Sequence, residues 1–471
     1  MKKFLTYLIL FTVCSSGYSQ DSLMNYLGLA ARNNPTVLQR FSEYQAALQK
    51  VPQVGALPDP ELNLGVFLQP MELIGGNQVA DIRLMQMFPW FGVLKNAKDE
   101  MSLMAKAKYE SLRAAKQEVF YNVQQTWYEL YKTNKDIQIS EKNISILKTL
   151  ERLALVKFRT ASAGDGGASV SSVSNMPSQS SSATSSGMNT MGGNGINNPS
   201  TISSSQPSGQ SGGMGSSPGG SGLADLYRIQ IETGDLENNI ALLKNQQSTI
   251  MARFNSYLNR PAQSPVAMAD TLRPDSLSVS LPALSDSMLR NNPMLGMLQY
   301  EQQSIDARKK MVTRMGYPMV GVGVNYSVIN KSDMSTSPMN GKDMIMPMVT
   351  VTLPIYRKKY KAMQTEADLM KTATAQNYSA TANSLQTDYY QAIQLYQDAK
   401  RRISLYANQS DLANKTLSIM LKSFATSGSG LTDILRIRQQ TLDYEFKQVE
   451  AVADYNTAIA WLERLGSIET H

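Results

Sequence analysis

The sequence predicts an α+β fold in which short β-strands continue into very long α-helices, with the whole unit present twice in tandem. The first observation is an alternating segment that ends at Phe88 and changes to a helical pattern after Pro89 and Gly92. The second is that no proline or glycine interrupts residues 93–160. With a rise of about 1.5 Å per residue, this helix is roughly 100 Å long, too long for a compact domain.

The third observation is that the second half of the chain repeats the first. A second alternating segment is interrupted by Pro354 and followed by another long helical pattern. The motif Arg-Asn-Asn-Pro occurs at 32–35 and again at 290–293, and the turn at 221–226 matches the turn at 429–434. A tandem repeat of helix, two strands, long helix, turn and return helix therefore decides the fold.

These patterns divide the chain into two repeats joined by a linker. The first repeat covers 20–260, with strands at 61–69 and 79–88, a long helix at 93–160 and a return helix at 223–258. The second covers 283–471, with strands at 319–329 and 343–353, a long helix at 357–424 and a return helix at 431–465, and the linker covers 261–282.

Both long helices carry a narrow apolar seam. In the first helix the seam consists of Val123, Leu130, Ile137 and Ile144, which recur at sevens. In the second helix the residues near one face are Leu385, Tyr389, Tyr396, Ile403 and Tyr406. Spacing by sevens is typical of coiled coils rather than of helices in compact domains.

Residues 1–19 predict a secretory signal peptide. Lys2 and Lys3 precede an apolar run at 4–13 and a small, polar stretch at 15–19. Cys14, the only cysteine of the chain, lies inside this segment; lipid attachment is the alternative, although the residues before it lack the usual small side chain. The mature chain is therefore expected to be exported and to contain neither thiols nor disulfides.

The charge of the chain is spread rather than concentrated. The formal net charge is +7, but lysines and arginines are interspersed with acids, and the densest basic run is 357–361. That run indicates a solvated or headgroup-facing collar and not a nucleic-acid site. After the signal peptide no segment reaches the roughly 18 apolar residues of a transmembrane helix, so any membrane crossing must use β-strands.

Four segments, at 61–69, 81–88, 319–329 and 344–353, have the alternation of bilayer-spanning strands, with Gln86 as an exception on an apolar face. Such strands are ~9–11 residues long. A soluble hairpin would alternate too, but export and the repeat favour a membrane. Four strands cannot close a barrel and open edges are not tolerated in lipid, so several chains must combine. Two chains would give a filled eight-stranded barrel, whereas three would give a twelve-stranded barrel with a lumen.

Several motifs together resemble the TolC-type outer-membrane efflux proteins of Gram-negative bacteria. They are the Asn-Pro pair in each opening helix, Ala-Leu-Pro-Asp-Pro at 56–60, Phe-Pro-Trp-Phe-Gly at 88–92 and the two Gly-x-x-Asp turns. The resemblance covers residues 21–466 except for one insert. The Pro-Asp-Pro and Pro-Trp-x-Gly pieces are most similar to the outer subunits of copper/silver and cobalt/zinc/cadmium exporters.

The resemblance implies a homotrimer in which a twelve-stranded outer-membrane β-barrel, surrounded by outer-membrane lipid, continues into a periplasmic α-helical coiled-coil barrel. It implies docking to a periplasmic adaptor (membrane fusion) protein and to an inner-membrane pump of the RND type. The function is then passive conduction of substrates that the pump expels. No cofactor is implied, and nucleic acid is not expected as a partner.

The resemblance also assigns roles to residues at turns and junctions. The turns between long and return helices form the periplasmic tip, where Asp433 and its counterpart Asp225 are the expected gate. Symmetry-related carboxylates around a neck would attract cations; the alternative is that each aspartate caps its return helix. The residues expected to meet the adaptor are Gly222, Leu223, Gly428, Gly430 and Leu431, with Gly428 one position nearer the aspartate than is usual in the family.

The strand–helix junctions have their own markers, which are Pro89, Trp90, Gly92 and Pro354. Proline has no N–H to give to a strand ladder, and its fixed φ suits the first turn of a helix. We therefore expect each proline at a strand-to-helix transition near the periplasmic membrane surface.

The insert at 164–221 is the unusual part of the chain. It contains no lysine, arginine or aromatic residue, and its only charge is Asp165, so it is predicted to be disordered. One interpretation is a tolerated loop expansion. The other is capture of Cu(I) or Ag(I) by soft thioether ligands, which would be Met176, Met188, Met191 and Met214.

The chain has 27 methionines, and an excess of methionine is ordinarily core filling. In the strands, however, parity places six of them on the polar face, which in a barrel is the lumen. These are Met85, Met87, Met319, Met344, Met346 and Met348. Thioethers along a lumen would offer weak sites to soft Cu(I) or Ag(I), so metal-ion export is one substrate class, with drug efflux and type I protein secretion as alternatives.

Catalysis has little support in the sequence. The one histidine is the terminal His471, mature cysteines are absent, and no Gly-rich phosphate loop follows a strand. We therefore expect no enzymatic activity. The remaining alternative, from a different class, is a periplasmic coiled-coil scaffold that conducts nothing.

Overall fold

The computed structural model describes residues 22–164, 221–268, 270–277, 279–427 and 430–468. The first half contains α2 (Ser22–Asn33), α3 (Pro35–Gly55), β1 (Glu61–Leu73), β2 (Gly76–Phe88), α4 (Val93–Gly164) and α5 (Ser221–Tyr257). The second half contains α6 (Leu281–Asn291), α7 (Pro293–Met315), β3 (Met319–Asn330), β4 (Met344–Thr352), α8 (Arg357–Ser427) and α9 (Leu431–Gly466). The two halves have the same order of elements, which confirms the α+β class and the tandem repeat.

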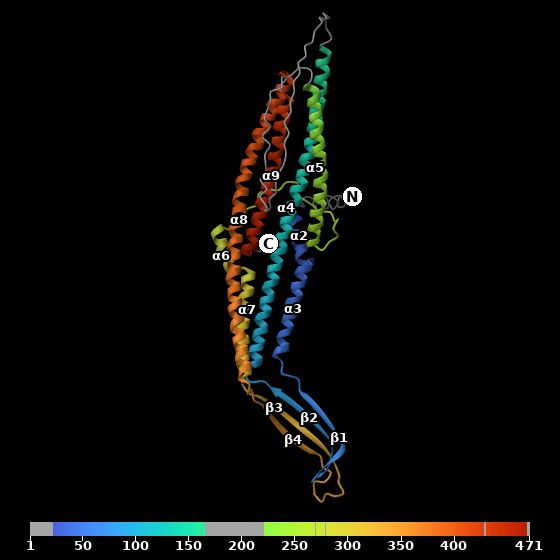
Figure 1. The fold of residues 1–471 in the computed structure, drawn as a ribbon, viewed down its shortest axis with the longest axis vertical. Coiled ribbons are helices and arrows are strands. Elements are labelled where there is room, and N and C mark those ends of the chain that lie inside the picture. The colour runs from blue at the N-terminus through green and yellow to red at the C-terminus, as the bar shows by residue number, and fades with distance from the viewer. Residues whose placement is uncertain (1–21, 165–220, 269, 278, 428–429, 469–471) are drawn as a thin grey trace, which may run out of the picture.

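The molecule is elongated, with the sheet at one end and long helices making up the rest (Figure 1). α4 and α8 run from the sheet towards the opposite end, and α5 and α9 pack beside them on the way back. The 72 residues of α4 correspond to a helix of roughly 110 Å, because nothing in its sequence breaks the hydrogen-bond ladder. Within the described residues no helix is both long and apolar enough to cross a membrane.

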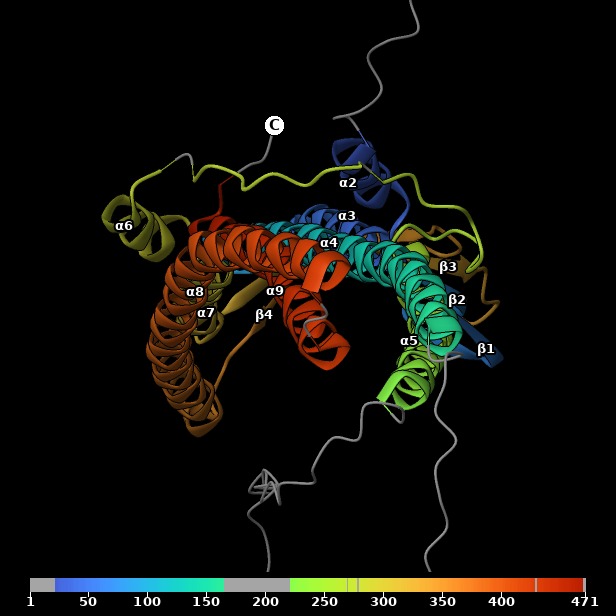
Figure 2. The ribbon, with the colours of Figure 1, turned by 90° about the horizontal axis from the view of Figure 1, so that it is seen from above.

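The helices form a curved wall. Seen along the long axis, α8, α4 and α5 lie on an arc, while α2 and α6 lie on its outer side (Figure 2). α4 is central to this wall, since it contacts α3, α5, α7 and α9. α7 packs against both α4 and α8 and thereby joins the two halves near the sheet. The arc leaves one side open, so one chain supplies a segment of a wall and not a closed ring.

The predicted seam of the first long helix is buried. Val123, Leu130, Ile137 and Ile144 are all less than a tenth exposed, which confirms the coiled-coil interpretation of their spacing. In α8, Leu385 and Tyr389 are buried, and the other three seam residues are half-buried. The seam of α4 contributes to two apolar clusters. One joins α4, α5, α8 and α9 in the half away from the sheet, and the other joins α2, α3, α4, α5 and α9 at mid-height.

The Asn-Pro pair has the same structural role in both halves. Asn34 caps α3 by accepting hydrogen bonds from the backbone N–H groups of Thr36 and Val37, at 2.9 and 3.3 Å. Its Nδ2 donates to the carbonyl of Tyr257 at the end of α5, at 2.8 Å. Asn292 likewise accepts from the N–H of Met294 and donates to the carbonyl of Leu465 near the end of α9, at 3.0 and 3.4 Å. Each pair thus starts one helix and ties it to the return helix of its own repeat.

The four strands form one antiparallel sheet in the order β1-β2-β3-β4. β1 and β4 therefore each keep one unpaired edge. The first hairpin is longer than the predicted strands 61–69 and 79–88, since pairing resumes after a register shift between Val66 and Met71 and continues to the turn at Ile74 and Gly75. Pro70 lies within that shift, where its missing N–H and the broken alternation hid the end of the strand from sequence analysis.

Other element ends also differ from the predicted ones. α4 continues to Gly164 and α8 to Ser427, each one turn further than predicted, and α6 begins at Leu281, inside the predicted linker. α6 starts early because Ser280 and Pro282 supply a favourable first turn, with proline among the first helical residues. The predicted insert lies outside the described residues except for its two ends, which extend α4 and α5.

Candidate functional site

The strand pairing sorts the sheet into two chemically different faces. On one face lie the apolar residues, which are largely exposed in the single chain: Leu62, Leu64, Val66, Ile82, Leu84, Phe88, Val320, Val322, Val324, Ile345, Val349 and Val351. Leu64 and Val349, for example, are 68 % and 72 % exposed. Gln86 shares this face, but its Nε2 donates to the backbone carbonyls of Pro58 and Met87. Its amide nitrogen is therefore satisfied by the backbone.

The six methionines lie together on the opposite face. Pairing partners directly across a ladder share a face, so the register places Met344 with Ser327 and Asp81, and Met346 with Asn325 and Arg83. The same register aligns Met85 and Met348 with Gly323, Met87 with Gly321, and Met319 with Thr352. No register shift occurs between β3 and β4, and the one between β2 and β3 lies between Gln78 and Ala80, beyond these rows.

Two glycines of β3 lie beside the methionines of β2. A Cβ atom on Gly321 would lie 2.5 Å from the sulfur of Met87. The sulfur of Met87 therefore lies directly over the backbone of β3. A Cβ atom on Gly323 would lie 2.7 Å from the carbonyl oxygen of Leu84 and 3.4 Å from the Cβ of Met85, so the close approach of the β2 backbone also requires glycine there. The sequence showed these glycines only as small residues opposite a valine row, because alternation says nothing of which neighbouring side chain uses the space.

The strand–helix junctions contain the predicted residues in defined contacts. Pro89 follows the last residue of β2, and Trp90 stacks on Tyr317 with ring centroids 5.4 Å apart. Gly92 has a φ of +89°, a conformation that L side chains rarely adopt, and its carbonyl accepts a hydrogen bond from Asn96 Nδ2 at 2.6 Å. Pro354 lies between β4 and α8. Both prolines end a strand, but the helices begin three or four residues later, so neither occupies the first helical turn.

At the far end of the helices, Asp433 lies in the first turn of α9 with its side chain half exposed. The N-cap of α9 is Gly430, with no side-chain cap hydrogen bond, so Asp433 is not the capping residue, although as an acid in the first turn it lies near the positive end of the helix. Its carboxylate instead pairs with Arg436 on the same helix at 3.3 Å. Leu431 is buried in the apolar cluster of that region, whereas Leu223 is 46 % exposed.

The other residues predicted for this end are less fully described. Gly222 and Asp225 belong to α5, but the side chain of Asp225 lies outside the described structure. Gly428 lies outside the described residues altogether. The structure thus brings Gly430, Leu431 and Asp433 together at the start of α9.

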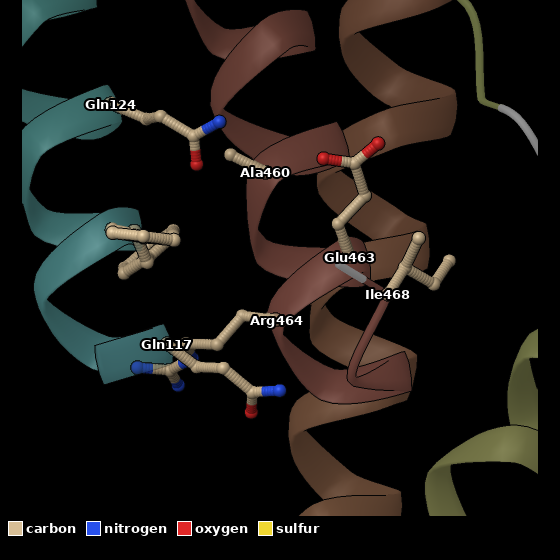
Figure 3. Close-up of a pocket in the computed structure, with 8 residues that line it drawn as sticks. Gln117, Gln124, Ala460, Glu463, Arg464 and Ile468 are labelled. Carbon is tan, nitrogen blue, oxygen red and sulfur yellow. The ribbon is translucent and has the colours of Figure 1, made fainter. Parts of the chain in front are cut away.

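A small cavity between α4 and α9 was not anticipated from the sequence. It has room for about one water molecule, at ≈ 20 Å³. Figure 3 shows Gln117 and Gln124 of α4 on one side and Glu463 and Arg464 of α9 on the other. Burial, and secondarily the charge of Asp275 in the linker, raises the pKa of Glu463 to about 7. No ion pair joins Glu463 to another described residue, so its charged form is poorly compensated.

Further along the same helix pair, polar groups are buried between α4 and α9. Arg438 is 4 % exposed, and its Nε donates to Asn143 Oδ1 at 2.6 Å, while its Nη2 has no partner among the described residues. Burial lowers the pKa of Arg438. Burial also raises the pKa of Asp136 to about 6, against the opposing effect of Lys132. No group of three or more His, Cys, Asp or Glu side chains in the described part of the chain is arranged to hold a metal ion.

Comparison with known proteins gives no match by sequence, since no protein-family model and no curated protein matches the chain. Solved structures do match. The Campylobacter jejuni CmeC outer membrane channel aligns with a TM-score of 0.68 at 12 % identity, over 95 % of this chain and 85 % of that chain. The Neisseria gonorrhoeae MtrE outer membrane channel, in its open state, gives 0.67 and 12 %, over 95 % and 89 %. The chain has the TolC-type fold.

CusC, whose structures concern folding and transmembrane channel formation, gives a TM-score of 0.69 at 12 % identity, over 97 % of this chain and 95 % of that chain. The match therefore includes both the helices and the sheet. In the TolC-type fold a helical barrel adjoins a β domain, and the described chain supplies one curved wall segment and one four-stranded segment of that arrangement. At this level of identity the likeness concerns the fold.

Proposed function

We propose that the chain is one subunit of a homotrimeric outer-membrane channel, which passively conducts substrates expelled by an inner-membrane pump through a periplasmic adaptor protein. The observation that carries the proposal is the two-faced sheet with two open edges. An exposed apolar face suits lipid, and the opposite face, with Asp81, Arg83 and Ser327, suits a water-filled lumen. A soluble scaffold protein would have no use for an apolar face of this size.

The directions of the strands favour closure by further copies of the chain. All three neighbouring pairs are antiparallel, so β1 and β4 run in opposite directions. The free edge of β4 in one subunit is therefore suited to antiparallel pairing with the free edge of β1 in the next. Three copies supply twelve strands, enough to leave a lumen, whereas two would supply only eight.

The residues around the strand–helix junctions support a membrane boundary there. Phe91 and Tyr356 are 87 % and 84 % exposed, and Trp90 stacks on Tyr317 beside them. Amphipathic rings gather where lipid headgroups meet water. The basic run at 357–361 begins directly after Tyr356, where it is suited to interact with headgroup phosphates.

The architecture is tested by cross-linking and conductance. We expect the purified full-length protein in detergent to yield a covalent trimer after treatment with an amine-reactive cross-linker. Reconstituted into planar bilayers, it should conduct ions. Monomers and dimers alone, or a stable trimer that conducts nothing, would contradict the channel and favour the scaffold.

For the substrate, we propose soft monovalent metal ions, Cu(I) and Ag(I), on the strength of the six methionines that share the polar face. Thioethers bind soft cations weakly and reversibly, whereas hard cations gain nothing from them. In a deletion strain, the wild-type chain should restore tolerance of copper and silver. A variant with the six methionines changed to leucine should restore it only in part, because leucine keeps the shape and removes the sulfur. Restoration of drug tolerance alone would favour drug efflux instead.

For the gate, we propose that Asp433 faces the closed neck of the trimer, with Asp225 as its counterpart in the first repeat. Asp433→Asn should raise the resting conductance in planar bilayers or weaken block by divalent cations, because a ring of charges is removed without a change of shape. The matched control is Asp443→Asn, since Asp443 is also about half exposed on α9 and paired with a neighbouring cation, Lys447. Identical conductance in the two variants would contradict the gate role of Asp433, and its pairing with Arg436 would be its remaining interaction.

A further inference from the structure

The six methionines of the polar face are not equivalent in their surroundings. Met319, Met344 and Met346 are exposed in the single chain, whereas Met85, Met87 and Met348 are half-buried. The half-buried three gather in two neighbouring rows of the sheet. Met85 and Met348 flank Gly323, and Met87 lies beside Gly321 in the next row.

The intervening glycines are what allow these side chains to meet. Strands β2 and β4 lie about 10 Å apart on either side of β3, since neighbouring strands are roughly 4.8 Å apart. A side chain on Gly323 would stand between Met85 and Met348 and separate them. With glycine there, two flexible thioether chains can approach each other over bare backbone. The sulfur of Met87 already occupies the space above Gly321.

A buried acceptor next to this group also lacks a partner. Asn325 is 8 % exposed, lies on the same face one row from Gly323, and its Oδ1 accepts no hydrogen bond from any described residue. A buried acceptor of this kind needs a donor, a water or a cation. Glu61 lies in the same row as Met85, Arg83 lies one row away with Asn325, and Asp81 lies two rows away with Ser327. The charge directly beside the methionines is therefore a carboxylate.

We propose that Met85, Met87 and Met348 form a binding site for one soft monovalent cation, Cu(I) or Ag(I), above the backbone of Gly321 and Gly323. The inference rests on the proposed channel function, within which the site lies on the lumen side of the barrel. Three neutral thioethers provide soft, low-charge coordination that Ca²⁺ and Mg²⁺ do not use. The remaining three methionines line the same face without forming a site.

The test compares two triple variants of the full-length trimer in detergent by titration calorimetry with Ag(I). Met85→Leu/Met87→Leu/Met348→Leu should lose one bound Ag(I) per chain or at least tenfold in affinity. The matched control Met319→Leu/Met344→Leu/Met346→Leu should retain the site within about twofold, and methionines elsewhere contribute equally to both variants. Equal losses in the two variants, or a full complement of Ag(I) in the first, would overturn the site.

A single substitution on the neighbouring strand tests the same geometry without removing any sulfur. A Cβ on Gly321 would meet the sulfur of Met87 at 2.5 Å and no backbone atom closer than 3.6 Å. Gly321→Ala should therefore displace the thioether at little cost to the strand and weaken Ag(I) binding severalfold; unchanged binding would remove Met87 from the site.

Conductance of the same preparations separates the proposed Ag(I) site from the proposed channel function. A conducting trimer without the Ag(I) site contradicts the site alone, and a chain that forms no conducting trimer contradicts the channel.

Discussion

Replacing Asn34 with alanine is expected to lower the free energy of unfolding by about 2–4 kcal/mol. The cap of α3 is lost, which costs about 1 kcal/mol. The carbonyl of Tyr257 is left without its donor in a partly buried setting, which costs about 1–3 kcal/mol more. Thermal unfolding in detergent, followed by circular dichroism at 222 nm, measures the loss. Asn292→Ala should behave similarly, because Asn292 makes the equivalent contacts in the second repeat.

The repeated motif supplies a matched control for this prediction. Asn33 and Asn291 directly precede the two capping residues, but both are exposed. Asn33→Ala and Asn291→Ala should therefore change the free energy of unfolding by no more than about 0.5 kcal/mol. Equal effects of neighbouring asparagines would show that the cap and the tie to the return helix do not stabilise the fold.

Changing Glu463 to glutamine is expected to stabilise the protein at alkaline pH and to have little effect in acid. The folded protein raises the pKa of Glu463 from its ordinary 4.5 to about 7, chiefly through burial. Between pH 4.5 and pH 7 the folded chain holds a proton on Glu463 that the unfolded chain releases. The stabilisation of the folded state by this proton is therefore complete below about pH 4.5 and is lost as the pH rises to about 7. Its upper limit is about 3 kcal/mol, reduced by solvent screening because the side chain is partly exposed.

The measurement is the melting temperature of wild type and variant at pH 5 and pH 8. Glutamine resembles the protonated carboxyl, so the difference in favour of Glu463→Gln should grow as the pH rises. Glu118→Gln serves as the control, because Glu118 is an exposed glutamate on the neighbouring helix α4. If the difference in melting temperature between Glu463→Gln and wild type does not change with pH, the folded protein does not raise the pKa of Glu463.

Periodicity accounts for what the sequence could predict. A change from period two to a helical period at Pro89, and its repetition at Pro354, was enough to predict the element order, the seam at Val123 and Leu130, and the faces of the sheet. These features depend on residues close in sequence. The shared face of the six methionines follows from the same alternation, since a residue cannot change face without a bulge. Their pairing across the sheet became visible only in the structure.

Contacts between distant residues account for what it could not predict. Asn34 and Tyr257 are 223 residues apart, and no local pattern connects them. Leu431 was expected at a docking surface, but it is 3 % exposed and belongs to an apolar cluster that also includes residues of α4, α5 and α8. Glu463 looks like any helical glutamate in sequence, and only the packing of α9 against α4 and the approach of Asp275 make it unusual. Asp433 has the residue type of a helix cap, yet the capping position is three residues earlier, at Gly430.

The open edges of β1 and β4 also bear on the order in which the protein matures. The long helices have a buried interior within one chain, so they gain most of their stabilisation before any partner arrives. In the proposed trimer the sheet would gain its closure from other copies, so its persistence would depend on the concentration of chains. If the chain is exported as its N-terminal sequence predicts, it would carry a folded helical part beside a sheet whose edges are still unpaired. We expect its passage across the periplasm to depend on holding proteins that cover strands and not helices, and dilution to dissolve the sheet while the helices remain.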